Sequence, residues 1–220
     1  VDPIEKKPLY HFHPGEEILS LGSIGCNLRC PFCQNHTISQ KPFAPTRFLS
    51  IDELLHSAAD TKLVAFTYAE PVVWYEYVFD AAKAFKAAGK KIVLVTNGFI
   101  NEAPLRLLLQ HVDAMNIDLK GDDAFYRETA KGNGDDVRRT ISIAAEHCHV
   151  EITTLAVTGL NDAPGIIDGI ASFVAGIRPT IPLHLSAYHP AYRYTETATG
   201  DALLLTLSRT AKKHLRYVYI

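Results

Sequence analysis

Short apolar runs alternate with stretches of helical periodicity along most of this chain. The apolar runs predict β-strands at residues 17–24, 62–67, 92–96, 114–119, 150–157, 182–187 and 217–220. Apolar residues at helical spacing predict helices at residues 51–60, 72–88, 105–111, 137–147, 166–177 and 202–214. The first helix begins with a capping-box pattern, Ser50 followed by Glu53, and the second ends at Gly89.

This alternation of strands and helices indicates the class of fold. It implies right-handed βαβ units, and therefore an α/β protein with a parallel sheet and outer helices. Six or seven such units are too few for the eight of a complete barrel. A partial barrel and an open doubly wound sheet are both compatible with the pattern. The polar residues 121–136 predict a surface loop, and no repeat or linker divides residues 1–220 into separate domains.

The composition excludes several classes of function. Of the 220 residues 47% are hydrophobic, enough for a sizeable core, and 22 Lys and Arg against 24 Asp and Glu give a net charge of −2. A nearly neutral chain offers no electrostatic basis for binding nucleic acid or an anionic membrane. No apolar run reaches the roughly 18 residues of a membrane span, and no secretory signal is visible.

Three of the four cysteines, Cys26, Cys30 and Cys33, lie within eight residues of each other. Clustered thiols in a chain with a sizeable core indicate metal or redox chemistry in a reducing compartment, here the cytoplasm. Three thiolates can bind an iron–sulfur cluster and leave one iron open, whereas His36 as a fourth ligand would complete a structural zinc site. Three inert buried thiols are the third alternative, but the residues between them form no apolar stripe. The distant Cys148 is expected to pack in the core.

Polar residues follow the ends of most predicted strands. The cysteines follow the first strand, and later strands lead into Glu70, Thr96, Asp118 and His189. In both candidate architectures, ligands bind at the carboxyl ends of the parallel strands. The sequence therefore predicts that these residues meet at one edge of the sheet and form one site.

The cysteine spacing resembles a known signature. Cys26-x3-Cys30-x2-Cys33, with Phe32 directly before the last cysteine, is similar to the motif of the radical S-adenosylmethionine (radical SAM) superfamily. The resemblance implies a partial (β/α)6-type barrel of parallel strands and one 4Fe–4S cluster held by the three cysteines. It also implies that the open iron binds SAM, and that one-electron reduction cleaves SAM to methionine and a 5′-deoxyadenosyl radical that abstracts hydrogen from a substrate.

A narrower resemblance extends over nearly the whole chain. Residues 2–12, 66–71, 112–120 and 184–190 resemble the radical SAM member of the AmmeMemoRadiSam group, which is similar to pyruvate formate-lyase activating enzymes. The chain looks like the core domain of that family, without the N- and C-terminal extensions of a longer protein.

The resemblance also implies a set of SAM-binding residues. They are Phe32, Asn35, Tyr68, Ala69, Glu70, Thr96, Asn97, Asp118, Lys120 and His189. Residues 68–71 stand where the superfamily has a Gly-Gly-Glu-Pro-like segment that receives the SAM amino group, and Pro71 favours an extended Glu70. Asp118 and Lys120 together can bind an amino-acid zwitterion, and Phe32 offers stacking area to the adenine.

His189 matches a late histidine that lies near the ribose and adenine of SAM in the relatives. Other positions differ from the activating enzymes. Those enzymes have a monovalent-cation site, and Val95 stands here in place of one of its acidic residues, while Asn116 occupies the position of another ligand. Thr153 and Thr154 stand in place of an arginine that contacts SAM in those enzymes. The sequence therefore leaves the presence of the cation site open and removes the arginine contact with SAM.

Three functional hypotheses follow. The chain is a radical SAM oxidoreductase that generates a glycyl radical on a partner enzyme, a radical SAM enzyme that acts on a small molecule within the AmmeMemoRadiSam system, or a non-enzymatic zinc-binding module. Both enzymatic hypotheses require a one-electron donor such as flavodoxin or ferredoxin, and the first also requires a protein substrate. An open barrel with few units leaves a wide lateral mouth, which suits a protein segment or a bulky substrate.

Overall fold

The computed structural model describes residues 1–41 and 46–220. Within these residues, eight strands form one sheet, and their order in space is their order in the sequence. They are β1 (Asp2–Pro3), β2 (Glu17–Leu21), β3 (Leu63–Phe66), β4 (Lys91–Thr96), β5 (Ala114–Asp118), β6 (His149–Ala156), β7 (Leu183–Ala187) and β8 (Val218–Tyr219). Neighbouring strands from β2 to β8 are parallel, whereas β1 pairs antiparallel with β2.

This strand order distinguishes the two architectures that the sequence left open. A doubly wound sheet reverses its order at a switch point, whereas here each strand lies beside its predecessor. The sheet curls without closing, because no pairing joins β8 to β1 or β2 within the described residues. The fold is therefore the predicted partial (β/α) barrel.

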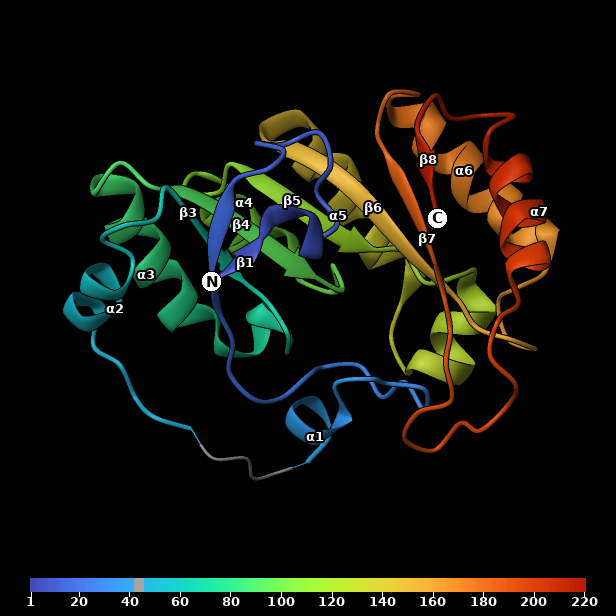
Figure 1. The fold of residues 1–220 in the computed structure, drawn as a ribbon, viewed down its shortest axis with the longest axis horizontal. Helices are drawn as coiled ribbons and strands as arrows, with labels where there is room; N and C mark the ends of the chain where they lie inside the picture. Colours follow the sequence, from blue (N-terminus) through green and yellow to red (C-terminus); the bar gives the residue numbers. More distant parts are fainter. Residues whose placement is uncertain (42–45) are drawn as a thin grey trace.

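Helices cover the outer face of the sheet (Figure 1). They are α2 (Ile51–Ser57), α3 (Tyr75–Ala87), α4 (Glu102–Leu109), α5 (Gly134–His147), α6 (Pro164–Ile177) and α7 (Asp201–Ala211), and the shorter helical segments are η1 (Ile4–Lys6), α1 (His36–Ser39), η2 (Pro71–Trp74) and η3 (Phe125–Ala130). Outward side chains such as Val64, Phe66 and Ile92 belong to the larger hydrophobic core under these helices. Every helix in the described ranges is too short or too polar to cross a bilayer.

Local sequence signals set several helix ends. The predicted capping box is present, because the Ser50 hydroxyl accepts from the Glu53 N–H (3.2 Å) and the Glu53 carboxylate accepts from the Ser50 N–H (2.8 Å). Gly89 follows α3 with a φ of +75°, as expected for a glycine after a helix end. Helix α4 begins three residues before the predicted start at 105, since Pro104 lies in its first turn, where no N–H is needed.

The predicted surface loop at residues 121–136 is wrong. Within this stretch, Phe125–Ala130 form a short π-helical segment, and Gly134 begins α5. Phe125 and Tyr126 are buried although charged residues surround them in the sequence. The polar composition of the stretch concealed two aromatic side chains that pack under the end of β5.

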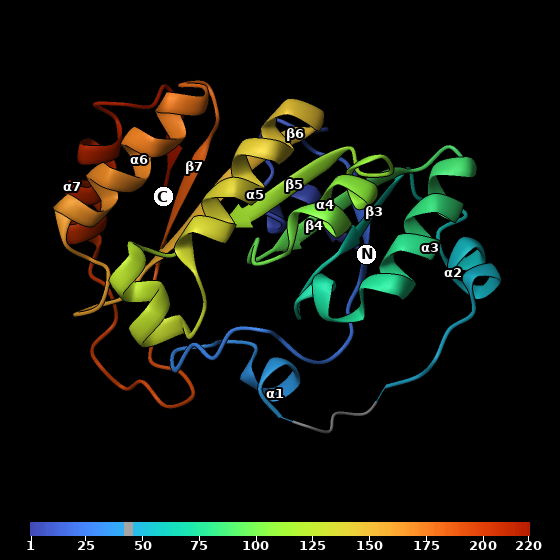
Figure 2. The same ribbon diagram turned by 180° about the vertical axis from the view of Figure 1, so that it is seen from behind.

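The N-terminal segment (residues 1–13) covers the inner face of the sheet. It lies on the opposite side of the sheet from α3, α4 and α5, as Figure 2 shows from behind. Its Ile4 and Leu9 are fully buried and pack with Ile18, Leu63 and Val93 in a second, smaller core. Because strand side chains alternate between faces, these strand residues point inward while their neighbours face the helices.

Glu151 on β6 attaches the N-terminal segment to the barrel. Its fully buried carboxylate accepts from the backbone N–H groups of Tyr10 (3.1 Å) and His11 (2.7 Å). His149 and His184 also contact it, at 2.9 and 2.7 Å. Burial alone would raise the pKa of Glu151, but these four contacts outweigh it and lower the pKa to about 2. An ionised carboxylate therefore holds the segment in place.

This attachment predicts a pH dependence of stability. A carboxylate whose pKa is lowered on folding stabilises the protein above its unfolded pKa, and that contribution is lost as the pH falls from 4.5 toward 2. This difference between the unfolded and folded pKa of Glu151 contributes on the order of 3 kcal/mol to the free energy of unfolding at neutral pH. Denaturant unfolding across this range should show a steeper loss of stability in the parent chain than in Glu151→Gln.

The exposed Glu128, paired with Arg127 on η3, provides the control for this measurement. Glu128→Gln should keep the parent's slope of unfolding free energy against pH. Equal slopes for the parent chain and Glu151→Gln would show that Glu151 does not carry this stabilisation.

Candidate functional site

A cavity of about 390 Å³ lies at the carboxyl ends of the strands. Its lining contains every predicted site residue except His189. These residues are Cys26, Cys30, Phe32, Cys33, Asn35, Tyr68, Ala69, Glu70, Thr96, Asn97, Asp118 and Lys120. The predicted convergence of strand ends is therefore present in the structure, as expected for a parallel barrel.

His189 is the predicted site residue that the structure does not bring to the cavity. It is exposed in the loop after β7. The preceding Tyr188 anchors this loop, since its ring is fully buried and its hydroxyl donates to the Tyr194 carbonyl (2.7 Å). The predicted contact between His189 and SAM stays a prediction.

The cysteines lie on a loop between β2 and α1 that several segments hold in place. Backbone hydrogen bonds join Gly25 to Ile38 (2.9 Å) and to Glu70 (3.1 Å), Arg29 to Ala130 (2.8 Å), and Pro31 to Arg193 (2.9 Å). Gly25 has a φ of +101°, and a Cβ there would lie 3.2 Å from the Val73 side chain. Only glycine meets both conditions without strain.

The three thiols face the same cavity. Cys30 is buried, Cys26 and Cys33 are half-buried, and the Cys33 sulfur lies 3.1 Å from the Ser39 hydroxyl. Burial raises the pKa of Cys30 to about 11 and also raises the pKa of Cys26. A bound metal centre would supply the positive charge that such thiolates need, so this donor set fits an iron–sulfur cluster.

The fourth ligand of the zinc alternative lies elsewhere. The His36 ring stacks on Tyr192, with 4.9 Å between the ring centroids, and His36 is absent from the cavity lining. In the described part of the chain, no three Cys, His, Asp or Glu side chains are arranged to hold a single metal ion.

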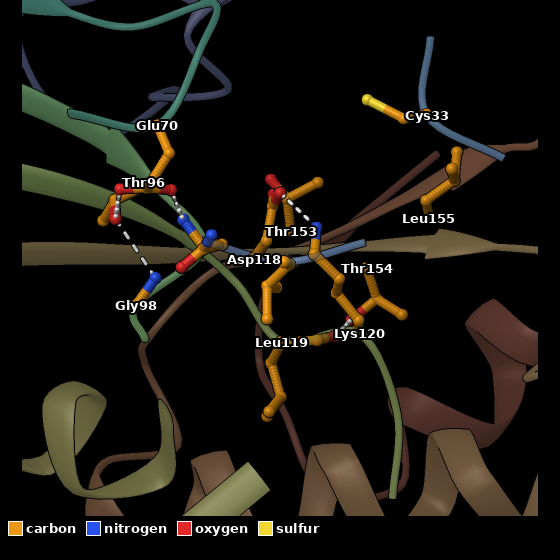
Figure 3. A network of polar contacts seen from close by, with 12 residues as sticks. Cys33, Glu70, Thr96, Gly98, Asp118, Leu119, Lys120, Thr153, Thr154 and Leu155 are labelled. Atoms are coloured by element: carbon orange, nitrogen blue, oxygen red, sulfur yellow. Dashed lines mark hydrogen bonds and ion pairs between the residues drawn. The ribbon is translucent and has the colours of Figure 1, made fainter. Parts of the chain in front are cut away.

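Glu70 connects the turn after β3 to the end of β4 (Figure 3). Its buried carboxylate accepts from the Thr96 hydroxyl (2.6 Å), the Asn97 N–H (2.8 Å) and the Val72 N–H (3.2 Å). Burial raises the pKa of Glu70 to about 7, although the three hydrogen bonds oppose this shift. Glu70 is extended before Pro71, as predicted. Its side chain therefore fixes two strand ends relative to each other.

Asn97 extends this network to the cysteine loop. Its side-chain amide donates to the Asn27 side chain (2.8 Å) and lies 3.5 Å from the Cys26 sulfur. A continuous set of polar contacts therefore runs from Glu70 through the end of β4 to the first cysteine. Networks of this kind hold side chains in one arrangement when every member is bonded.

Asp118, the last residue of β5, forms an ion pair with Lys120 at 2.7 Å (Figure 3). The buried Tyr126 hydroxyl accepts from the Lys120 N–H (3.0 Å) and fixes this turn. Burial alone would lower the pKa of Lys120, but the nearby Asp118 and Cys30 outweigh it and leave the pKa raised. Lys120 is therefore a permanent cation beside a thiol.

Tyr68 adopts an unusual backbone conformation. Its φ of +69° lies in the left-handed region, which costs a non-glycine residue roughly 1–2 kcal/mol. Three contacts hold it there: its hydroxyl donates to Asp2 (2.5 Å), its carbonyl accepts from the Asn35 side chain (2.8 Å), and the Lys7 ammonium lies 4.3 Å from its ring centroid. Residues 68–71 resemble the Gly-Gly-Glu-Pro-like segment of the superfamily, in which glycine stands at the position of Tyr68. Glycine adopts this backbone conformation freely.

The sequence did not identify one wall of the cavity. Lys6, Lys7 and Pro8 of the N-terminal segment line it, and Asn116 on β5 holds the Pro8 carbonyl through its side-chain amide (2.8 Å). Resemblance marked residues 2–12 as part of the family pattern, but no local signal indicates that they enter the barrel. Tyr126 was also missed, because it lies in the stretch predicted to be a loop.

Comparisons with known proteins identify the family of this chain. The model of the radical SAM superfamily matches residues 21–166. An uncharacterized protein of Methanocaldococcus jannaschii is 38% identical to this chain over 231 aligned positions, which span 100% of this chain and 68% of that protein.

Solved structures share the fold at low sequence identity. Streptococcus suis SuiB bound to its precursor peptide SuiA matches with a TM-score of 0.72 and 14% identity, over 99% of this chain and 51% of SuiB. A domain of pyruvate-formate lyase-activating enzyme from Bacteroides vulgatus matches with a TM-score of 0.62 and 19% identity, over 71% of this chain and 97% of that domain. This chain thus spans about half the length of SuiB. Because the family model matches most of the chain, this protein belongs to the radical SAM superfamily.

Proposed function

We propose that this chain binds one 4Fe–4S cluster through Cys26, Cys30 and Cys33 and cleaves SAM reductively beside it. One observation carries the proposal: the three thiols face the same cavity as the polar strand ends, whereas His36, the fourth ligand of the zinc alternative, does not line it. When bound, the cluster and SAM supply a 5′-deoxyadenosyl radical for hydrogen abstraction. Family membership supports this chemistry, and the position of His36 argues against the closed zinc alternative.

The strand-end residues supply positioning and charge in this proposal. Asp118 and Lys120 form a pair of opposite charges on one side of the cavity, which complements the ammonium and carboxylate of an amino acid. Glu70 acts through others: by bonding to Thr96 and Asn97 it holds the segment that would receive the SAM amino group. Phe32, buried at the cavity wall, offers an apolar surface to the adenine.

Two kinds of substrate agree with the structure. The open lateral side of the barrel suits a segment of a partner protein, and therefore glycyl radical formation on an enzyme. The N-terminal segment, which lines one wall of the cavity, instead favours a small molecule that fits inside the barrel. In either case a one-electron donor such as flavodoxin or ferredoxin would serve as the reductant.

The direct test is anaerobic reconstitution with iron and sulfide, followed by reduction in the presence of SAM. We expect an electron paramagnetic resonance signal of a reduced 4Fe–4S cluster and release of 5′-deoxyadenosine. A chain that binds one zinc ion and no iron would contradict the enzymatic proposal. A glycyl radical in a candidate partner, or a modified small molecule without a protein radical, would distinguish the two kinds of substrate.

Replacing one cluster ligand should abolish the reaction while the fold survives. Cys30→Ala removes a thiol from a loop that backbone hydrogen bonds hold independently, so the circular dichroism spectrum should be retained. Release of 5′-deoxyadenosine should fall to background. Cys148→Ala, which changes a thiol outside the cavity lining, is the matched control and should keep both cluster and activity. Normal release from Cys30→Ala would show that the loop is misassigned.

Replacing the positioning carboxylate should weaken SAM binding. Glu70→Gln keeps the shape of the side chain but replaces one of the two oxygens that accept from Thr96 and two backbone N–H groups with an NH2 group, which only donates. Loss of these hydrogen bonds in a buried site should raise the dissociation constant of SAM roughly ten-fold, measured by equilibrium dialysis on the cluster-loaded protein. The exposed Glu76 on α3 is the control, and Glu76→Gln should bind like the parent. Equal SAM affinity for Glu70→Gln and the parent chain would exclude the positioning role.

A further inference from the structure

We propose that Lys7 recognises a carboxylate or phosphate group of the substrate. This inference rests on the proposed function, because it assumes that the substrate enters the cavity described above. Lys7 belongs to the N-terminal segment and lines the cavity together with Lys6 and Pro8. It therefore brings a positive charge to the inside of the barrel. The other charged residues of the site, apart from Lys6, lie at or just after the carboxyl ends of strands, whereas Lys7 lies in the N-terminal segment.

The Lys7 ammonium is buried but only partly bonded. Its side chain is 2% exposed, and within residues 1–41 and 46–220 its ammonium makes one hydrogen bond, to Asp2 (2.8 Å). An ammonium has three N–H donors. One bonds to Asp2 and another side of the group faces the Tyr68 ring, so the ammonium can still donate to a further oxygen. Buried donors without partners are costly. A ligand oxygen in the cavity would satisfy them.

The charges around Lys7 do not cancel. Asp2 is a single carboxylate that accepts from both Lys7 and Lys6, at 2.8 and 3.0 Å. Its pKa is held well below the usual range by Lys7 first, then by Tyr68 and its other donors. Two ammonium groups thus share one negative charge, and this wall keeps an excess positive charge. By contrast, Lys120 already has Asp118 as its own partner.

The wall is also rigid. Ile4 and Leu9, on either side of Lys7 in the sequence, are fully buried inside the barrel. The Pro8 carbonyl accepts from Asn116 on β5, and Asn116 in turn accepts from the Thr153 hydroxyl (3.0 Å). A charge held in this way loses little conformational entropy on binding. The geometry therefore matches a preformed subsite for an anionic oxygen.

The test uses the cluster-loaded, SAM-bound protein without reductant, titrated calorimetrically with inorganic phosphate, with succinate and with neutral succinamide. We expect binding of phosphate or of succinate, which identifies the anion class, and no binding of succinamide. Lys7→Met should weaken the anion roughly ten-fold or more, as for loss of a charge-assisted hydrogen bond. Lys91→Met is the matched control, since Lys91 also pairs with a largely buried aspartate, Asp113 (3.0 Å), but lies outside the cavity.

A second measurement avoids the risk that Lys7→Met does not fold. In crystals of the parent chain soaked with the binding anion, the anion should lie within hydrogen-bond distance of the Lys7 ammonium and not beside Lys91. The assignment is overturned if neither anion binds, if Lys7→Met binds like the parent, or if the bound anion lies away from the Lys7 ammonium. No step needs SAM cleavage, so a protein that cleaves SAM but binds no anion rejects only the role of Lys7. A protein that binds the anion but never cleaves SAM rejects the proposed function instead.

Discussion

Two backbone N–H groups of the N-terminal segment donate to the buried carboxylate of Glu151, and the interior of the barrel depends on this attachment. A partial barrel leaves part of its inner face without a partner, and an uncovered apolar face is unfavourable in water. Here Ile4 and Leu9 cover the inward residues of β2 to β4. The same attachment positions Lys7 and Pro8. The N-terminal segment therefore both packs against the inner face of the sheet and forms one wall of the cavity.

At the carboxyl ends of β3 to β5, two carboxylates bond to neighbouring residues and hold them in place. Glu70 bonds to Thr96 and Asn97 on β4, and Asn97 reaches the cysteine loop. Asp118 neutralises Lys120 beside the thiols. Glu70, Asp118 and Lys120 thus each have protein partners before any ligand enters, which limits the cost of burying them. The arrangement explains how a chain of near-neutral charge keeps several ionised groups in one cavity.

Local and short-range signals predicted much of this molecule. The capping box at Ser50, the glycine after α3 and the alternation of strands and helices follow from periodicity and backbone chemistry, and strand-end convergence follows from parallel pairing. The entry of Lys7 into the barrel could not be predicted, because it depends on contacts with Asn116 and Glu151 more than one hundred residues away. Tyr126 escaped notice because composition averages over a stretch, whereas burial is decided residue by residue.

The fastening of the cysteine loop has a consequence for maturation of the protein. Its backbone is bonded to α1, to the turn at Glu70, to the end of η3 and to the loop at Arg193. These hydrogen bonds order the loop as the chain folds, so cluster binding would cost little further conformational entropy. An iron–sulfur donor would meet three thiols that line a common cavity, and delivery would be governed by access through its opening.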